Sequence, residues 1–405
     1  MLKDKNILIG VCGGISAYKV CDLVSRLKKK EANINIIMTR ASTNFINPLT
    51  FQSLSLNKVV SDMFDKPSYL EIDHISLAKK ADIFVIAPAT ANIMGKIANG
   101  IADDMLSTTI MATKAPVVLV PAMNSNMYEN PILQDNISLL KNYGYIFIDP
   151  VDGRLACGDT GKGKMAEPEF IEKFITSFLT SSSELKGKKI IVTAGPTKEP
   201  IDPVRFISNH STGKMGYAIA EKAANRGADV YLISGPTNLE MPIGVNLINV
   251  VSAKEMYNAI MSHYYNADVV IKSAAVSDYK PSEISSQKIK KEDEDLLIKL
   301  EKNPDILYEL GKIKENKILI GFAMETQNLI ENAKEKIKKK NLDFIVANDL
   351  NQKGAGFAFD TNIVKIIDKN GHVENISKMA KIDLADIIID RVIMLLKNRN
   401  IDKRL

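Results

Sequence analysis

The sequence has few cysteines, little net charge and no long apolar run. Three cysteines in 405 residues are too few for a disulfide framework, which predicts a reducing, cytoplasmic location. A net charge of +5 is small for this length and gives no support to a nucleic-acid partner, although it is compatible with small anionic ligands. No run approaches the ~18 apolar residues of a membrane span. A signal peptide is not expected either, because the first apolar run breaks at Gly13-Gly14.

The length and the pattern of apolar residues predict two α/β domains. Short apolar runs such as NILIGV and DIFVIAP alternate with helix-period segments in the first half, which is typical of βαβ units and a parallel sheet. The alternation restarts after a Ser/Thr-rich linker that ends at Lys186-Gly187. We therefore predict a flavodoxin-like or Rossmann-like domain at 1–187 and a second Rossmann-like domain at 188–405. The second domain should end in a hairpin that turns at 369–371 and a helix over about 378–397.

A glycine-rich segment, RLACGDTGKGKMAEP, has part of the spacing of a nucleotide-binding P-loop. Gly158 and Gly163-Lys164 fit, but Met165 stands where a Ser or Thr hydroxyl would bind Mg²⁺. Residues 149–153 are predicted as a turn, so no buried strand leads into the segment. A mobile loop that carries Cys157 is the better interpretation.

Small and polar residues follow three predicted strands of the first half at their carboxyl ends, where ligands bind in open α/β sheets. They are Gly13, Gly14, Ser16, Thr39, Ala89, Thr90 and Asn92. The glycine spacing after the first strand is not that of a dinucleotide site, so a mononucleotide with one phosphate is favoured. Ordinary turn and N-cap chemistry would explain any one of these motifs alone.

Longer motifs carry a family resemblance over about Asn6 to the last helix. His74, APATAN, PAMNSNM and ACGDTGKGKM resemble the flavin-dependent cysteine decarboxylase family. The second half, above all TAGPTKEPIDPVRFISNHSTGKMG, is similar to the phosphopantothenate–cysteine ligases that are fused to these decarboxylases in bacteria. The resemblance implies CTP-dependent ligation of 4′-phosphopantothenate to L-cysteine through an acyl-cytidylate, then FMN-dependent decarboxylation of the product to 4′-phosphopantetheine.

The resemblance implies roles for residues of the first domain. Oxidation of the CH₂–SH group to a thioaldehyde places an electron acceptor β to the carboxylate that leaves as CO₂. His74 would assist the oxidation, Asn124 would hold the substrate carboxylate, and Cys157 would donate a proton during re-reduction, from a flap over the site. Taken alone, a single histidine is more often structural than catalytic. Cys12 and Cys21 are predicted as small core residues.

Two positions of the first domain depart from the family pattern. Tyr128 replaces the usual Trp and keeps an aromatic wall, while Lys164 replaces a common Arg and loses its bidentate fork.

In the second domain the resemblance makes Asn209 and Lys288 catalytic. Asn209 would act on the acyl-cytidylate, and Lys288, the first residue of KIKK, would neutralise developing charge. Arg205 is a candidate contact of phosphopantothenate. The implied CTP contacts are Ser273, Ala274, Ala275, Asp278, Lys288, Phe322, Lys336 and Lys340. Without the resemblance, a solvated loop at 288–295 and a solvated basic helix explain these lysines equally well.

The resemblance also implies cofactors and an assembly. Mg²⁺ would accompany the triphosphate, although no carboxylate cluster identifies its ligands. Trimers of the decarboxylase domain, with the flavin at a subunit interface, and dimers of the ligase domain would build a dodecamer. The alternatives are a flavin-binding regulatory module, a peptide-cysteine decarboxylase and a flavin prenyltransferase, none of which needs the ligase half.

Overall fold

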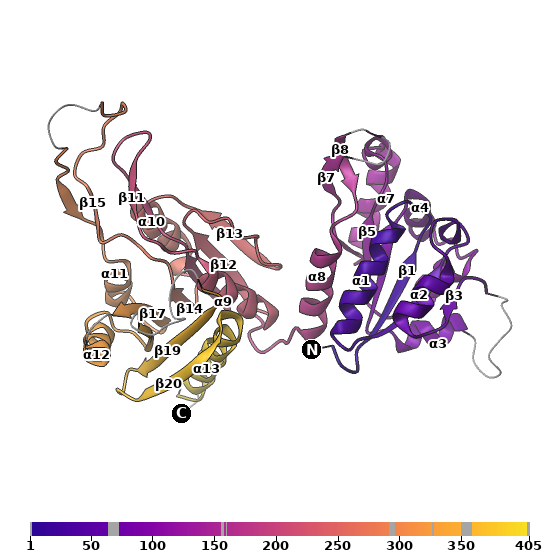
Figure 1. The fold of residues 1–405 in the computed structure, drawn as a ribbon. Helices are drawn as coiled ribbons and strands as arrows, with labels where there is room; N and C mark the ends of the chain where they lie inside the picture. The colour runs from indigo at the N-terminus through magenta and orange to yellow at the C-terminus, as the bar shows by residue number, and fades with distance from the viewer. Residues whose placement is uncertain are drawn as a thin grey trace. The chain divides into compact units, whose positions relative to one another are not determined.

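The computed structural model describes residues 2–63, 73–154, 158, 160–290, 296–325, 328–349 and 359–402. The chain divides into two compact units, Met1–Thr180 and Ser181–Leu405 (Figure 1). Residues 181–187, which we had assigned to the first domain, make contacts in the second unit, where the Ser182 amide donates to the Asn225 carbonyl at 2.8 Å and Leu185 is fully buried. No helix within the described ranges is long and apolar enough to cross a membrane.

The first unit is built on the predicted parallel sheet. Its six strands are all parallel, in the order β3 (Val59–Val60), β2 (Asn33–Met38), β1 (Asn6–Val11), β4 (Ile83–Ala89), β5 (Val117–Pro121), β6 (Ile146–Phe147). This is the doubly wound Rossmann order, in which the direction of winding reverses between β1 and β4.

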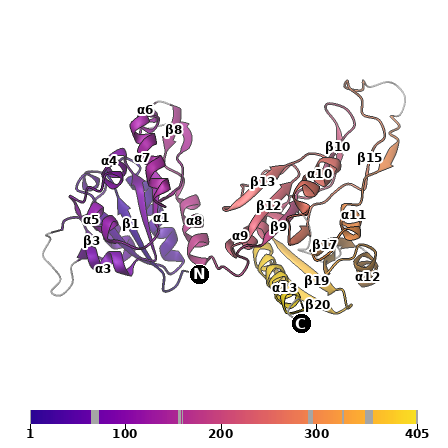
Figure 2. The ribbon, with the colours of Figure 1, turned by 180° about the vertical axis from the view of Figure 1, so that it is seen from behind.

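Helices cover both faces of this sheet, which explains why its strands are almost wholly apolar. The helices are α1 (Ala17–Lys29), α2 (Pro48–Ser55), α3 (Asp73–Lys80), α4 (Ala91–Ala98), α5 (Met105–Ala112), α6 (Ser125–Tyr128), α7 (Pro131–Asn142) and α8 (Pro168–Thr180), with a short 3₁₀ turn η1 (Ser42–Asn44). One face packs on α1, α2 and α8, and the other on α4, α5 and α7. Figure 2 shows α1 and α8 side by side from the reverse direction.

The glycine-rich segment differs from its prediction. Val151–Arg154 forms strand β7 and Thr160–Lys164 forms strand β8, and the two pair antiparallel. The prediction of a turn at 149–153 is therefore wrong from Val151 onward. The apolar pattern that marks a strand is missing because this small ribbon buries little. Cys157 lies outside the described residues.

The second unit repeats the parallel order and extends it with the predicted hairpin. Its sheet runs β13 (Val245–Asn249), β12 (Asp229–Ser234), β9 (Lys189–Ala194), β14 (Val269–Lys272), β17 (Ile318–Glu325), β18 (Phe344–Asp349), β19 (Thr361–Asp368), β20 (Val373–Ala380). The first six strands are parallel and the last two form an antiparallel hairpin that turns at Gly371, with φ 85°.

The helices of the second unit also cover both faces of their sheet. They are α9 (Lys214–Asn225), α10 (Ala253–Tyr264), α11 (Ile306–Lys312), α12 (Leu329–Lys339) and α13 (Lys381–Asp402). Helices α9 and α13 pack on one face, and α10, α11 and α12 on the other. Helix α9 approaches β9 closely at Gly216, where a Cβ atom would come within 2.6 Å of the Ala194 Cβ.

Two short antiparallel ribbons project from the loops of this sheet. One pairs β10 (Lys198–Pro200) with β11 (Phe206–Ser208), and the other pairs β15 (Tyr279–Pro281) with β16 (Leu300–Lys302) (Figure 1). Neither ribbon was predicted, because three-residue strands are too short to show a period.

A buried carboxylate joins three elements of the second unit. Asp343, 3% exposed, accepts hydrogen bonds from the Leu319 amide at 2.9 Å, from Lys314 Nζ at 2.8 Å and from Arg399 at 2.7 Å. It thereby fixes the start of β17 and the end of α13 beside β18.

We expect Asp343→Ala to lower the free energy of unfolding of the second unit by about 3 kcal/mol, because two cations lose their buried partner. Urea unfolding followed by circular dichroism measures this. Glu309→Ala, which removes the exposed Lys312–Glu309 pair, is the control and should change stability by less than about 0.5 kcal/mol. Equal effects of the two substitutions would contradict the assignment.

Candidate active sites

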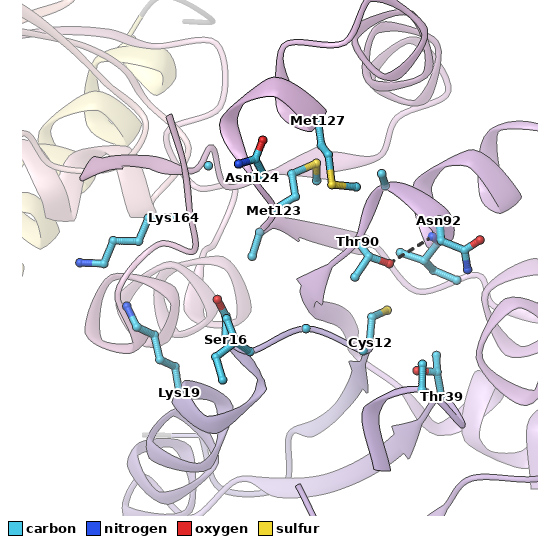
Figure 3. A pocket seen from close by; sticks show the side chains of 18 of the residues that line it. Cys12, Ser16, Lys19, Thr39, Thr90, Asn92, Met123, Asn124, Met127 and Lys164 are labelled. Atoms are coloured by element: carbon cyan, nitrogen blue, oxygen red, sulfur yellow. Dashed lines mark hydrogen bonds between the residues drawn. The ribbon is translucent and has the colours of Figure 1, made fainter. Parts of the chain in front are cut away.

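The first unit contains a cavity of about 1010 Å³ at the carboxyl ends of its central strands (Figure 3). Of the residues predicted to bind a mononucleotide, six line it: Gly13, Gly14, Ser16, Thr39, Thr90 and Asn92. Ala89 is fully buried at the end of β4 and is not among the lining residues. The cavity size suits a mononucleotide-sized ligand.

One side of this cavity is suited to an anion. Ser16 is the N-cap of α1, but its side chain makes no capping bond, so its hydroxyl faces the cavity beside the helix N-terminus. Gly13 lies so close to Ala41 that a Cβ atom would come within 2.6 Å of the Ala41 Cβ, which keeps this turn tight. The residues at this side therefore fit a single phosphate.

Two lysines lie together at the same side of the cavity (Figure 3). Lys19 and Lys164 both pair with Glu167, at 3.0 and 2.9 Å. Hydrogen bonds from Lys164 and Lys19 hold the pKa of Glu167 below its ordinary value. Lys164, which replaces the family's common Arg, is thus held in place by an ion pair.

Asn124 reaches the cavity from the segment after β5. It is the N-cap of the short helix α6, and its Oδ1 accepts a hydrogen bond from the Asn126 amide at 2.9 Å. The preceding Met123 amide donates to the Gly163 carbonyl at 3.0 Å, so the ribbon of β7 and β8 begins at the cavity wall. Gly163 has to be glycine here, because a Cβ atom would overlap the Met123 carbonyl oxygen.

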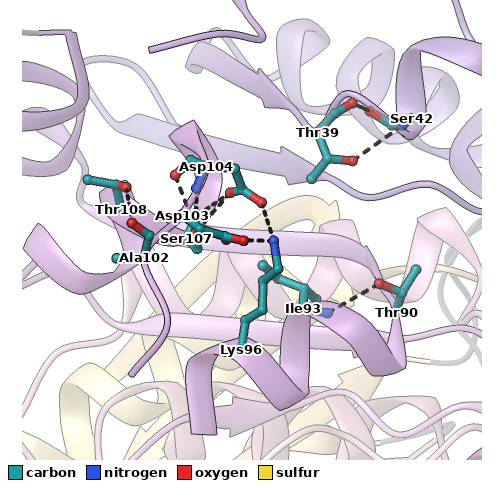
Figure 4. A network of polar contacts seen from close by, with 10 residues as sticks. All are labelled: Thr39, Ser42, Thr90, Ile93, Lys96, Ala102, Asp103, Asp104, Ser107 and Thr108. Carbon is teal, nitrogen blue, oxygen red and sulfur yellow. Dashed lines mark hydrogen bonds and ion pairs between the residues drawn. The ribbon is translucent and has the colours of Figure 1, made fainter. Parts of the chain in front are cut away.

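A polar network that the sequence did not reveal closes another side of the cavity (Figure 4). Lys96 Nζ bridges Asp103 at 2.6 Å and Asp104 at 2.8 Å, and both Lys96 and Asp104 line the cavity. Asp104 also caps α5 by accepting from the Ser107 amide at 2.8 Å. Burial alone would raise the pKa of Asp104, but its bonds to Lys96 and Ser107 lower it. The Asp104 carboxylate therefore stays ionised. The network places the Lys96 ammonium group at the cavity wall, where the two carboxylates balance its charge.

The other predicted residues of the first unit do not reach the cavity or fall outside the described part. His74 lies in the first turn of α3 and is not among the cavity-lining residues. Tyr128 is packed in the core, with Lys162 Nζ 5.7 Å from its ring centroid, and does not form the cavity wall that we expected. Cys12 is buried as predicted, yet it also lines the cavity, and burial raises the pKa of its thiol to about 12.

The second unit contains a cavity of about 470 Å³, also at the carboxyl ends of parallel strands. Eight predicted residues line it: Asn209, Ser273, Ala274, Ala275, Asp278, Phe322, Lys336 and Lys340. Five lysines, at positions 214, 272, 336, 340 and 381, face a single carboxylate, that of Asp278, among the described lining residues. Such an excess of positive charge suits a ligand with several phosphates.

The turn before α9 brings backbone donors to this cavity. The N-cap of α9 is Gly213, with φ 80° and no side-chain bond. The helix N-terminus therefore faces the cavity without a side-chain cap. Asn209 is fixed by a hydrogen bond from its Nδ2 to the Ala275 carbonyl at 3.1 Å.

Lys288 and Arg205 lie outside the residues that line this cavity. The Arg205 guanidinium donates to the buried Asp202 carboxylate at 2.9 and 2.6 Å and to the Ile289 carbonyl at 2.8 Å. Asp202 also accepts from the Ile289 amide at 3.2 Å. Arg205 is therefore an anchor for the residue that follows Lys288. Lys288 itself is exposed, and residues 291–295 are outside the described part.

Sequence reasoning missed several lining residues. Lys272 ends β14 after three apolar residues and was not included with the expected contacts that follow it, whereas Lys214 and Lys381 belong to separate helix starts. Asn348 and Asn362 lie on neighbouring strands, and each has a buried side-chain oxygen without a hydrogen bond. Only the fold brings these positions together.

We expect Lys96→Met to lower the free energy of unfolding of the first unit by about 1–2 kcal/mol, because the partly buried Asp104 and the exposed Asp103 lose their shared cation. Calorimetry of the full chain measures the shift. Lys79→Met, in an exposed position of α3, is the matched control and should leave the transition unchanged within error. A Lys96→Met protein as stable as this control would contradict the network's role.

Comparisons with known proteins agree with this two-part organisation. Residues 1–180 match the family model "Flavoprotein", and residues 185–396 match "DNA/pantothenate metabolism flavoprotein C-terminal domain". The chain is 48% identical over 400 residues to the "Coenzyme A biosynthesis bifunctional protein CoaBC" of Bacillus subtilis, with 98% of each chain covered. It is 45% identical over 393 residues to the Haemophilus influenzae protein of the same name, which covers 97% of this chain and 98% of that protein.

A solved structure of the C-terminal domain of such a protein is 45% identical, with a TM-score of 0.47; it covers 54% of this chain and 100% of that one. The near-complete coverage of the two full-length relatives includes both halves of the chain. The chain therefore belongs to the family of bifunctional coenzyme A biosynthesis proteins, with an N-terminal flavoprotein domain and a C-terminal pantothenate-metabolism domain.

Proposed function

We propose that the two cavities catalyse consecutive reactions: CTP-dependent ligation of 4′-phosphopantothenate with L-cysteine in the second unit, then FMN-dependent decarboxylation of the product in the first. The observation that carries the proposal is that most of the predicted ligand-binding residues line one of two cavities at strand carboxyl ends. Ligation leaves the cysteine carboxylate in place, so its product is the acid that the first unit would decarboxylate.

In the first unit the lining residues fit FMN. The helix α1 N-terminus and the Ser16 hydroxyl would bind its single phosphate, and the cavity of about 1010 Å³ leaves room for the ring system. The bound flavin would supply a two-electron oxidation of the thiol-bearing carbon and later return the electrons. Asn124 Nδ2 would donate a hydrogen bond to the substrate carboxylate, while Oδ1 accepts from the Asn126 amide. Cys157 would donate a proton from the flap.

His74 is not among the residues that line the first cavity within one chain, so its proposed role needs the trimeric arrangement that the resemblance implies. Ile15 and Tyr18 line the mouth of the first cavity and are 58% and 57% exposed, as expected for a site that a second copy covers. A trimer would bring residues of a neighbouring copy to this mouth, and His74 would act in that arrangement. Paired ligase units would complete the proposed dodecamer.

In the second unit the lysines would bind the triphosphate of CTP and orient it for attack. The phosphopantothenate carboxylate would displace pyrophosphate to form the acyl-cytidylate, with Asn209 beside the acyl group and Lys288 neutralising the developing charge. Cysteine would then displace CMP. Phe322 would lie against the cytosine, and Asp278 with residues 273–275 would contact the nucleotide. Arg205 would support substrate binding through the Ile289 segment that it anchors.

Mg²⁺ would be carried mainly by the triphosphate and water. No group of three or more His, Cys, Asp or Glu side chains that could hold a metal is present in the described part of the chain. Mg²⁺ usually keeps several waters and binds through substrate phosphates, so this fits a nucleotide-borne ion.

The direct test uses the purified full chain with 4′-phosphopantothenate, L-cysteine, CTP and Mg²⁺. We expect CMP, pyrophosphate, CO₂ and 4′-phosphopantetheine in equal amounts, and release of about one FMN per chain on denaturation. Chromatography and the visible spectrum measure these. If the chain decarboxylates the acyl-cysteine but does not hydrolyse CTP, only the decarboxylase assignment would be supported.

We expect two substitutions to separate the activities, because the sites lie in different units. Lys288→Gln should lower ligation at least about 100-fold, the scale of losing a charge-stabilising donor, and leave decarboxylation unchanged. Cys157→Ser should keep CO₂ release but accumulate a product two hydrogens lighter than 4′-phosphopantetheine, because serine is a poorer acid. Each variant is the other's control in a mass-spectrometric assay. Loss of both activities in either variant would refute the separation.

A further inference from the structure

Lys272 is a half-buried cation that lines the second cavity. It is the last residue of β14, a central strand, and pairs in register with Thr193 of β9 and Gly321 of β17. The preceding residues Val269–Ile271 are fully buried apolar side chains. A lysine at such a position costs stability unless its charge is used, because burial disfavours an ion.

The charged groups around Lys272 come from three segments of the second unit. Lys336 belongs to α12, Lys340 is its C-cap, Asp305 is the N-cap of α11, and Asp278 follows β14. Asp305 is already paired with Lys340 at 2.8 Å. Lys272 interacts with the two carboxylates only through space, without a hydrogen bond to either.

This environment disfavours a proton on Lys272 in the absence of ligand. Burial, with the nearby charges of Lys340 and Lys336, lowers the pKa of Lys272 to about 8. The side chain still faces the cavity, next to Ser273 and Ala274. A polyphosphate bound among these lysines would reverse the balance, because a nearby negative charge favours the ammonium form.

We propose that Lys272 binds the phosphates of the nucleotide and takes up its proton together with that ligand, so that nucleotide affinity depends on pH in the alkaline range. The inference rests on the proposed function and adds a phosphate-binding residue to it. The ligand class is a nucleoside triphosphate.

The direction of the pH dependence follows from linkage. At pH 7 Lys272 is already charged in the free protein, so binding takes up almost no proton. Above pH 8 the free protein has lost this proton, and binding must recover it. Affinity therefore falls as pH rises, by up to about tenfold per pH unit.

The test is calorimetric titration of CTP into the full chain between pH 7 and 9.5. Using two buffers of different ionisation enthalpy gives the number of protons taken up. The phosphates of CTP do not titrate at the upper end of this range. We expect uptake near zero at pH 7 and approaching one proton per CTP at pH 9.

Three variants make the test specific. Lys272→Met should bind CTP about tenfold more weakly at pH 7 and take up no proton at pH 9. Lys272→Arg should take up no proton while keeping most of the affinity, because arginine stays charged throughout. Lys381→Arg is the control, since burial also lowers the pKa of Lys381 in the same cavity; it should keep the uptake.

Two results would overturn the inference while the proposed function stands: proton uptake that persists in Lys272→Met, or uptake that vanishes in Lys381→Arg. A Lys272→Met protein that binds CTP as tightly as the wild type at pH 7 and at pH 9 would also overturn the inference. A wild-type chain that does not bind CTP at all would overturn the proposed function and the inference together.

Discussion

Both candidate sites depend on one constraint, the reversal of winding at the centre of a parallel sheet. In the first unit the connections that follow the neighbouring strands β1 and β4 run to opposite sides of the sheet. In the second unit the same holds for the connections that follow β9 and β14. Where two neighbouring connections diverge, the carboxyl ends of the strands are left uncovered and a crevice forms. The loops after these strands carry the lining residues of both cavities. Sites of different chemistry thus rest on the same backbone arrangement.

The linings of both cavities contain more cations than carboxylates. In the first, Lys19, Lys96 and Lys164 are each paired with a carboxylate, and Arg40 and Arg154 also line the cavity. In the second, Lys214 is paired with Asp360 and Lys340 with Asp305, and three further lysines line the cavity. Both linings therefore suit ligands that carry phosphate, and the two sites differ in volume and in residue type rather than in the sign of their charge.

The fold was largely predictable because buried parallel strands are apolar runs and the connecting helices are amphipathic. Once the strands were recognised, the ligand-binding residues of the first unit were predictable, because they follow the carboxyl ends of those strands. The family resemblance added Asn209 and the nucleotide contacts. Lys96 and Lys272 could not be predicted as cavity residues, because each resembles an ordinary surface lysine in the sequence. Only the folded structure brings Lys96 to Asp104 and Lys272 to the second cavity. The ribbon of β7 and β8 was missed because glycine and lysine give no alternating pattern. The roles of His74, Cys157 and Lys288 remain predictions.

The anchoring of Ile289 by Asp202 and Arg205 has a consequence for the entropy of catalysis. A long polar loop that had to close over a ligand from a disordered state would lose conformational freedom along its whole length. Here the backbone is held one residue beyond Lys288, on both its amide and its carbonyl. The backbone next to Lys288 therefore has less conformational freedom left to lose, so ordering this exposed side chain in its proposed role would cost less entropy.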